Sequence, residues 1–175
     1  MRVLLVLLLD PPPLLTVDPY RLETFADAAG AREAGATITH FGACGLCSSV
    51  RDLAIYMRYP DLTEPVRACG LRGVFGSPDE VRTCIEALGF SAPCAQIWWF
   101  NTLATRASCA EPCFASPDQP YHRPDGTLDA CLLCDEQKSG PTFKAIAGRT
   151  RRNTGLANAM CRPCSEVRPL DHDHR

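Results

Sequence analysis

Two cysteines separated by two residues, Cys44 and Cys47, are the best candidates in this chain for chemistry. This spacing allows a disulfide to close between them, and the first thiol of such a pair is the more exposed one. His40 lies four residues before Cys44, where an imidazole can stabilise a thiolate. The pattern predicts a redox-active dithiol in which Cys44 attacks a disulfide or another electrophile and Cys47 resolves the product. A structural disulfide and a pair of metal ligands are the alternative hypotheses.

The residues on either side of this pair predict how it is positioned. Residues 36–41 alternate between two faces, as a strand does. After the pair, apolar residues recur at intervals of three and four up to Pro60, as in a helix. The cysteines are therefore expected where a strand passes into a helix, a position at which free backbone N–H groups and the helix dipole favour a thiolate.

The first thirty residues allow two interpretations of their apolar run, residues 3–9, which prolines follow. It is either a short buried strand or the start of a secretory signal, and it is too short to span a membrane. Asp18 and Pro19 then predict the start of a helix that ends at Gly30. Residues 2–58 would thus form a strand, a helix, a strand, the CxxC motif and a helix. This order resembles the opening of the thioredoxin fold, whose redox motif also follows the second strand.

Several helices are predicted from residue 77 onward. A capping box at residues 77–80 begins a helix that ends at Gly89, and the nearly all-apolar run 91–104 predicts a buried central helix. The proline-rich segment 115–126 is expected to be a surface loop. Two further helices are predicted, one capped by Thr127 that carries Cys131 and Cys134, and a short one at residues 143–147.

These patterns together predict a mostly α-helical, cysteine-rich, disulfide-stapled single domain with a small β element near the N-terminus. Its expected divisions are an apolar and proline-rich segment at residues 1–17, the cysteine-rich domain at 18–168, and a flexible tail at 169–175.

A basic, glycine-flanked stretch from Gly148 to Gly155 is a second candidate site. It contains Arg149, Arg151, Arg152 and Asn153, and no acidic residue occurs from residue 137 to residue 165. Arginine recognises carboxylate or phosphate groups through paired hydrogen bonds, and glycines allow close backbone approach. The stretch predicts a site for a small anionic ligand. The alternative is a solvated loop whose arginines meet nearby acidic side chains.

The number of cysteines indicates which cellular compartment suits the chain, and it also allows a metal site. Eleven cysteines in 175 residues indicate either crosslinks in an oxidising space or thiolate ligands in a reducing one. We expect the secretory pathway or another oxidising compartment. Two CxxC pairs, Cys131 with Cys134 and Cys161 with Cys164, form the outline of a four-thiolate zinc site, but disulfides to other cysteines are favoured. An odd total leaves one thiol free or paired with another chain.

The sequence is therefore compatible with three classes of function. The first is a thiol–disulfide oxidoreductase-like protein that acts on a protein thiol or disulfide. The second is a non-enzymatic, disulfide-stabilised binding or structural module with an anion-binding arginine loop. The third is a zinc protein, since no cofactor other than zinc is indicated. A formal charge of −2 argues against nucleic acid as the partner, and nothing in the sequence sets the oligomeric state.

Overall fold

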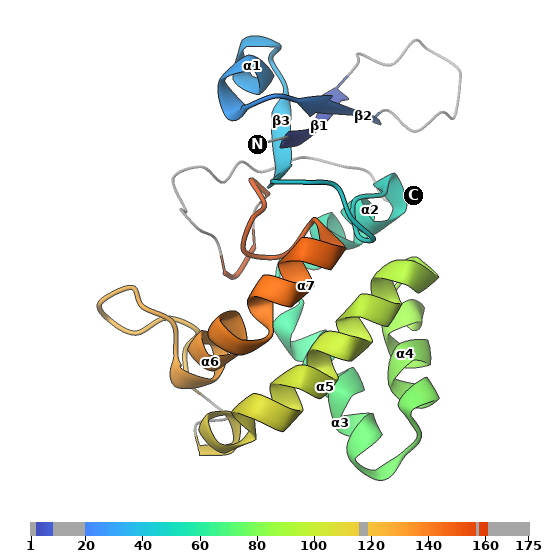
Figure 1. Cartoon of the computed structure of the whole chain (residues 1–175), viewed down its shortest axis with the longest axis vertical. Helices are drawn as coiled ribbons and strands as arrows, with labels where there is room; N and C mark the ends of the chain where they lie inside the picture. The colour runs from blue at the N-terminus through green and yellow to red at the C-terminus, as the bar shows by residue number, and fades with distance from the viewer. Residues whose placement is uncertain (1–2, 9–19, 116–118, 157, 161–175) are drawn as a thin grey trace. The chain divides into compact units, whose positions relative to one another are not determined.

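A computed structural model of the chain describes residues 3–8, 20–115, 119–156 and 158–160. The predicted fold class is confirmed, because the chain is mostly helical, with a small β element near its N-terminus and several disulfides. Its contacts group into two compact units (Figure 1). The first comprises Met1–Pro60 and Ala147–Arg175, and the second comprises Asp61–Ile146. The predicted boundaries near residues 17 and 168 fall outside the described residues and stay predictions.

The first unit contains a three-stranded antiparallel sheet (Figure 1). Its strands are β1 (Val3–Leu8), β2 (Tyr20–Phe25) and β3 (Thr37–Phe41), in the order β2-β1-β3. β1 pairs with both neighbours, and its register with β3 shifts between Leu4 and Leu5. The first apolar run thus forms a strand, while its interpretation as the start of a secretory signal stays a prediction.

The predicted helix after Asp18 is wrong. Tyr20–Phe25 forms β2, and the helix of this region is the short α1 (Ala28–Glu33). Asp27 caps α1 by accepting a hydrogen bond of 2.9 Å from the amide of Gly30. The aromatic and β-branched residues of Tyr20–Phe25 suit a strand once β1 offers an edge to pair with, and this tertiary contact outweighs the helical spacing.

The predicted thioredoxin-like order is also wrong. Two strands, not one, precede α1, and β1 and β3 are antiparallel neighbours. A strand–helix–strand unit of the thioredoxin kind has parallel strands joined by a crossover helix. The helix after the cysteines does form, as α2 (Val50–Arg58), with Leu53, Ile55 and Tyr56 buried.

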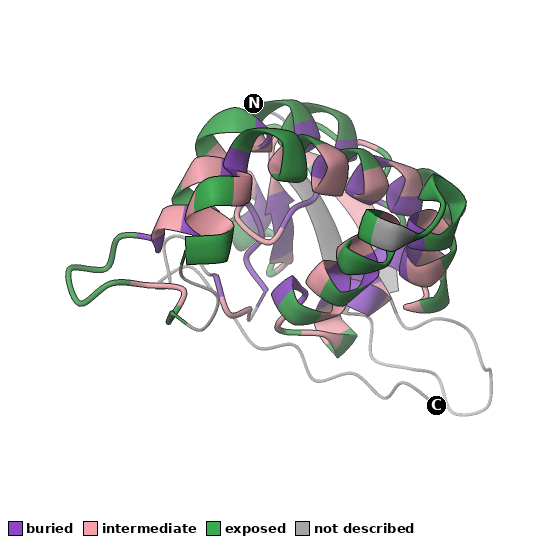
Figure 2. Cartoon of the chain, turned by 90° about the horizontal axis from the view of Figure 1, so that it is seen from below, coloured by how far each residue is buried: buried purple, intermediate pink, exposed green. Residues whose placement is uncertain are grey.

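The second unit is a group of helices, with a long loop between α5 and α6 (Figure 1). They are α3 (Thr63–Phe75), α4 (Pro78–Ala87), α5 (Ala92–Ala115), α6 (Ala130–Lys138) and α7 (Gly140–Ala147). The core lies around Trp98 of the predicted central helix, whose ring is 6.1 Å from Phe90 and 4.7 Å from Phe143 between centroids. Buried and exposed residues alternate along the helices (Figure 2). No helix in the described ranges combines the length and the apolarity needed to cross a membrane.

Three disulfides crosslink the helices of the second unit. Cys69–Cys84 joins α3 to α4. Cys109–Cys134 and Cys113–Cys131 both join α5 to α6, and the second lies inside the loop that the first closes. The cysteines of α5, four residues apart, thus pair with those of α6, three apart, because each set shares one face of its helix.

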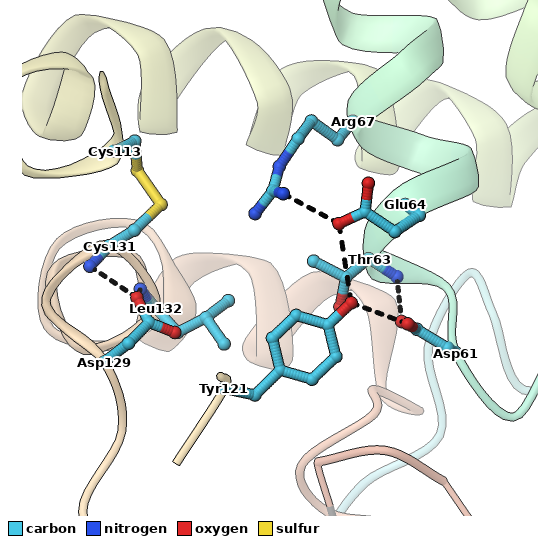
Figure 3. Close-up of polar contacts among 9 residues, drawn as sticks. All are labelled: Asp61, Thr63, Glu64, Arg67, Cys113, Tyr121, Asp129, Cys131 and Leu132. Atoms are coloured by element: carbon cyan, nitrogen blue, oxygen red, sulfur yellow. Dashed lines mark hydrogen bonds and ion pairs between the residues drawn. A yellow bond between two sulfur atoms is a disulfide. The ribbon is translucent and has the colours of Figure 1, made fainter. Parts of the chain in front are cut away.

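A hairpin-like loop between α5 and α6 is held to the start of α3 (Figure 3). The hydroxyl of Tyr121 donates to a carboxylate oxygen of Asp61 at 2.6 Å. Gly126 forms the tip with a positive φ of 79°, so a residue without a side chain suits this turn. At the far end Asp129, rather than the predicted Thr127, caps α6 by accepting from the amides of Cys131 and Leu132.

Candidate functional site: the Cys44 loop and the Arg149 loop

The two candidate sites of the sequence lie together in the first unit. The Cys44 loop (residues 42–49) joins β3 to α2, and the Arg149 loop (residues 148–155) follows α7. The amide of Cys47 donates to the carbonyl of Ala147 at 2.8 Å. A Cβ atom placed on Gly148 would lie 2.3 Å from the amide nitrogen of Gly45, and Gly148 has a φ of 73°. Only glycine fits this contact without a shift of the Cys44 loop.

The second half of the Arg149 loop runs along β3. The amide of Phe41 donates to the carbonyl of Asn153 at 2.6 Å, and the Thr154 hydroxyl donates to the carbonyl of Thr39 at 2.6 Å. A Cβ atom on Gly155 would lie 2.3 Å from the carbonyl oxygen of Ile38. The two flanking glycines therefore allow close backbone approach, as the sequence indicated, but the backbone they approach is that of the chain itself.

Arg149 is fully buried and binds the Cys44 loop. One terminal nitrogen of its guanidinium donates to the carbonyl oxygens of Cys47, at 2.9 Å, and Ser49, at 3.1 Å. The other donates to the hydroxyl of Thr39 at 3.3 Å, and the carbonyl of Arg149 accepts from the hydroxyl of Tyr56 at 3.1 Å. This arginine thus satisfies backbone carbonyls that face away from water.

The charge of Arg149 persists despite its burial. Desolvation lowers the pKa of the guanidinium to about 10, and the negative charges available at Tyr56, Asp52 and Cys44 act in the opposite direction. The side chain is therefore a cation at neutral pH. A buried positive charge stands beside the loop that carries Cys44.

The other members of the predicted anion site divide into two kinds. Asn153 is buried, and its amide accepts from the amide of Thr150 at 2.7 Å while donating to the carbonyls of Phe41, at 2.8 Å, and Gly148, at 2.7 Å. Its role in this structure is to shape the Arg149 loop. Arg151 and Arg152 are partly exposed, so they are the predicted members that solvent reaches.

The two cysteines of the CxxC motif are in different states. Cys44 is a free, exposed thiol, whereas Cys47 is fully buried and disulfide-bonded. The bond at Cys47 therefore does not close the motif. Cys44 also lies outside a helix start, because α2 begins only at Val50 and its N-terminal cap is Ser49. The expectation that a helix dipole acts directly on Cys44 is wrong.

His40 is linked to the amide that follows Cys44. Its Nε2 atom is 3.0 Å from the hydroxyl oxygen of Ser48, and this oxygen accepts from the amide of Gly45 at 3.0 Å. Burial, and then the neighbouring Arg149 cation, lower the pKa of His40 to about 4, while a backbone hydrogen bond to Phe41 opposes them. The ring is neutral at pH 7, so it acts on the Cys44 loop through Ser48 and not through charge.

Sequence reasoning missed Ser48, Thr39 and Tyr56 as parts of this arrangement. Ser48 had a local signal, since it directly follows the CxxC motif. The contact of Thr39 and Tyr56 with Arg149 joins residues about a hundred positions apart, and no local pattern marks it.

Two of the four cysteines of the predicted zinc site form disulfides instead. Cys131 and Cys134 are bonded to Cys113 and Cys109, so these sulfurs are not thiolate ligands in this structure. Cys161 and Cys164 lie outside the described residues. Within the described ranges, no group of three or more His, Cys, Asp or Glu side chains is placed to hold a metal ion.

Comparison with known proteins gives a family but no activity. A family model described as a family of unknown function, DUF8771, matches residues 78–169, more than half of the chain. The chain belongs to this family. The DUF8771 match spans α4 to α7, both α5–α6 disulfides and the Arg149 loop, while Cys44 and His40 precede it. No curated protein and no solved structure matches the chain.

Proposed function

We propose that this disulfide-stabilised protein exchanges disulfides with a partner protein through Cys44. The observation that carries the proposal is the contrast among the cysteines. Eight of those that the structure describes are disulfide-bonded, and Cys44 is free and exposed. Among the cysteines that the structure describes, the exposed thiol of Cys44 is therefore the one that can attack a disulfide.

The reaction is an exchange that needs no cofactor. The Cys44 thiolate attacks one sulfur of a partner's disulfide, a mixed disulfide forms at Cys44, and the second sulfur of the partner leaves as a thiolate. The thiolate is the nucleophile in this step. The guanidinium of Arg149 donates to the carbonyl of Cys47 in the Cys44 loop, which supports a role for the Arg149 loop in the reaction.

The surroundings of Cys44 support a built site. The peptide after Cys44 is oriented by the hydrogen bonds from Gly45 to Ser48 and from Ser48 to His40. The peptides around Cys47 are held by Arg149 and Ala147. A nucleophile on a supported loop keeps one orientation, which favours attack along one line.

The disulfides support an oxidising compartment, because such bonds persist in the secretory pathway and comparable spaces. We therefore place the proposed exchange in that setting, with a protein disulfide or thiol as the partner.

The test is the reaction of the native chain with a disulfide of an aromatic thiol, whose release is followed by absorbance. One equivalent should react quickly, and peptide mapping should place the adduct on Cys44. Cys44→Ser should abolish this fast phase. The double variant Cys69→Ser/Cys84→Ser, which removes a bridge in the second unit, should retain it. A native thiol that reacts no faster than the same thiol in denaturant would rule the proposal out.

A further inference from the structure

We infer that Cys44 also exchanges with the disulfide of Cys47 inside the same chain. The Cys44 thiolate would attack the sulfur of Cys47, the Cys44–Cys47 bond would form, and the cysteine now bonded to Cys47 would leave as a thiolate. This inference rests on the proposed reactivity of Cys44, and it adds a regulated second state of the same site.

The spacing and the backbone of the Cys44 loop allow this bond. Cys44 immediately precedes a turn in which the amide of Ser48 donates to the carbonyl of Gly45 at 3.1 Å, and Cys47 lies within that turn. Two residues between cysteines is the spacing of redox-active pairs. On the other side of Cys44, Gly42 has a φ of 105°, a conformation that favours glycine, and a Cβ atom placed there would meet no atom within 4 Å.

Arg149 fixes the backbone at Cys47. Its guanidinium donates a hydrogen bond of 2.9 Å to the carbonyl of Cys47. The amide of Cys47 is fixed as well, by the carbonyl of Ala147. Cys47 is thus held on both sides of its Cα, while Cys44 is a free, exposed thiol three residues before it.

Burial favours an internal nucleophile over an external one. Cys47 is fully buried, so a thiol from solution does not reach its sulfur in the native state, whereas Cys44 lies three residues away. The exchange conserves electrons: one disulfide breaks, one forms, and one thiolate replaces another. It therefore needs no oxidant or reductant, and the relative stability of the two disulfides sets the populations.

Trypsin makes the two states easy to distinguish. No Lys or Arg lies between Arg32 and Arg51, so both cysteines stay in the peptide 33–51. In the described state this peptide is crosslinked to another peptide and carries one free thiol. After exchange it is released alone, two hydrogens lighter than its reduced form, and a new free thiol appears elsewhere in the chain.

The experiment incubates the native full-length protein, without reductant, from neutral to mildly alkaline pH, quenches it with acid and maps it by mass spectrometry. The lone oxidised peptide 33–51 should increase with pH, together with labelling of one new thiol. Cys44→Ser should show neither change, and Arg58→Met, an exposed substitution at the end of α2 that keeps both cysteines, should show both. If Cys44 forms mixed disulfides with an added disulfide but the lone oxidised peptide is absent at every pH, the internal exchange is overturned and the proposed function stands. If Cys44 forms no mixed disulfide, the proposed function fails with it.

Discussion

The guanidinium of Arg149 donates a 2.9 Å hydrogen bond to the carbonyl oxygen of Cys47, a residue 102 positions earlier in the chain. The same nitrogen reaches the carbonyl of Ser49 at 3.1 Å. One buried side chain therefore holds the backbone on both sides of Ser48, the residue that connects His40 to the Cys44 loop. The stability of the loop depends on the guanidinium as well as on the local sequence.

Arg149→Met should destabilise the protein by roughly 2–4 kcal/mol, because it removes the donor to the buried carbonyl of Cys47 and to the partly buried carbonyl of Ser49. Urea denaturation followed by circular dichroism measures the loss. Arg58→Met removes an exposed arginine at the end of α2, and its effect should stay within about 0.5 kcal/mol. Equal losses in the two variants would show that the hydrogen bonds of Arg149 contribute little.

Gly148→Ala should cost more than Gly126→Ala. Both glycines have φ values near 75°, at 73° and 79°, so alanine at either position costs about 1–2 kcal/mol of backbone strain. At Gly148 the new methyl group would also meet the amide of Gly45 at 2.3 Å, whereas Gly126 has nothing within 4 Å. Thermal unfolding should show the larger decrease for Gly148→Ala, and this variant alone should change the alkylation rate of Cys44. Similar behaviour in both variants would contradict the tight contact between the two loops.

His40 should make the protein less stable in mild acid. Its pKa in the folded state is about 4, below the value of 6.5 for an unperturbed histidine, so between these values the unfolded chain binds a proton that the folded chain does not. His40 does not reduce the free energy of unfolding above pH 6.5. As the pH falls from 6.5 toward 4, this free energy should decrease by about 3 kcal/mol. Denaturation at several pH values measures this loss.

The control for this pH dependence is a pair of variants. His40→Asn should reduce the loss between pH 6.5 and 4, because the buried imidazole is gone. His122→Gln, in the second unit, should keep the part that is due to His40. A wild-type stability that is flat over this interval would exclude a buried neutral His40.

The nested disulfides of α5 and α6 should not contribute additively. With Cys113–Cys131 intact, the outer bond Cys109–Cys134 constrains only a few more residues of the unfolded chain. Replacing both cysteines of one bridge with serine should therefore cost less than half of what the removal of both bridges costs, which we expect to reach roughly 3–5 kcal/mol. Denaturant titrations of the two double variants and the quadruple variant test this. Additive losses would indicate that each bond acts through native contacts instead.

Tyr121→Phe should loosen the loop between α5 and α6 without unfolding the helices. The variant loses the hydrogen bond to Asp61, a net contribution of about 1 kcal/mol (Figure 3). Hydrogen exchange at the amide of Asp129, which donates to the carbonyl of Tyr121, should become faster. Exchange in α4 serves as the internal control. Faster exchange in both places would indicate global destabilisation, contrary to a local role.

Local signals in the sequence predicted some elements well. The capping box at Ser77 and the apolar run around Trp98 gave helices at α4 and α5, because caps and burial patterns are local properties. α3 was missed, since Gly70 and Gly73 weaken its helical pattern and Leu62, at its N-cap position, has no side chain that can cap a helix. The helix predicted before Gly30 is wrong because this segment pairs with β1, and such a nonlocal contact leaves no local signal in the sequence.

The candidate site was also predicted only in part. Cys44, Cys47 and Arg149 were recognised as chemically interesting from their types and spacing. Their association was not, because the hydrogen bonds that join them connect residues about a hundred positions apart. The different states of Cys44 and Cys47 also depend on where the chain folds and not on the motif.

The late position of the Arg149 loop in the sequence imposes an order on synthesis. Thr39 and Thr154, which share a hydrogen bond, are 115 residues apart, so the ribosome makes the whole second unit between them. Until residues 148–155 emerge, the nascent chain has neither Arg149 nor Gly148 to hold the Cys44 loop. During that interval the backbone amide and carbonyl of Cys47 lack the hydrogen bonds that Ala147 and Arg149 provide in the finished protein. The Cys44 loop therefore reaches its final set of hydrogen bonds only after almost the whole chain has been translated.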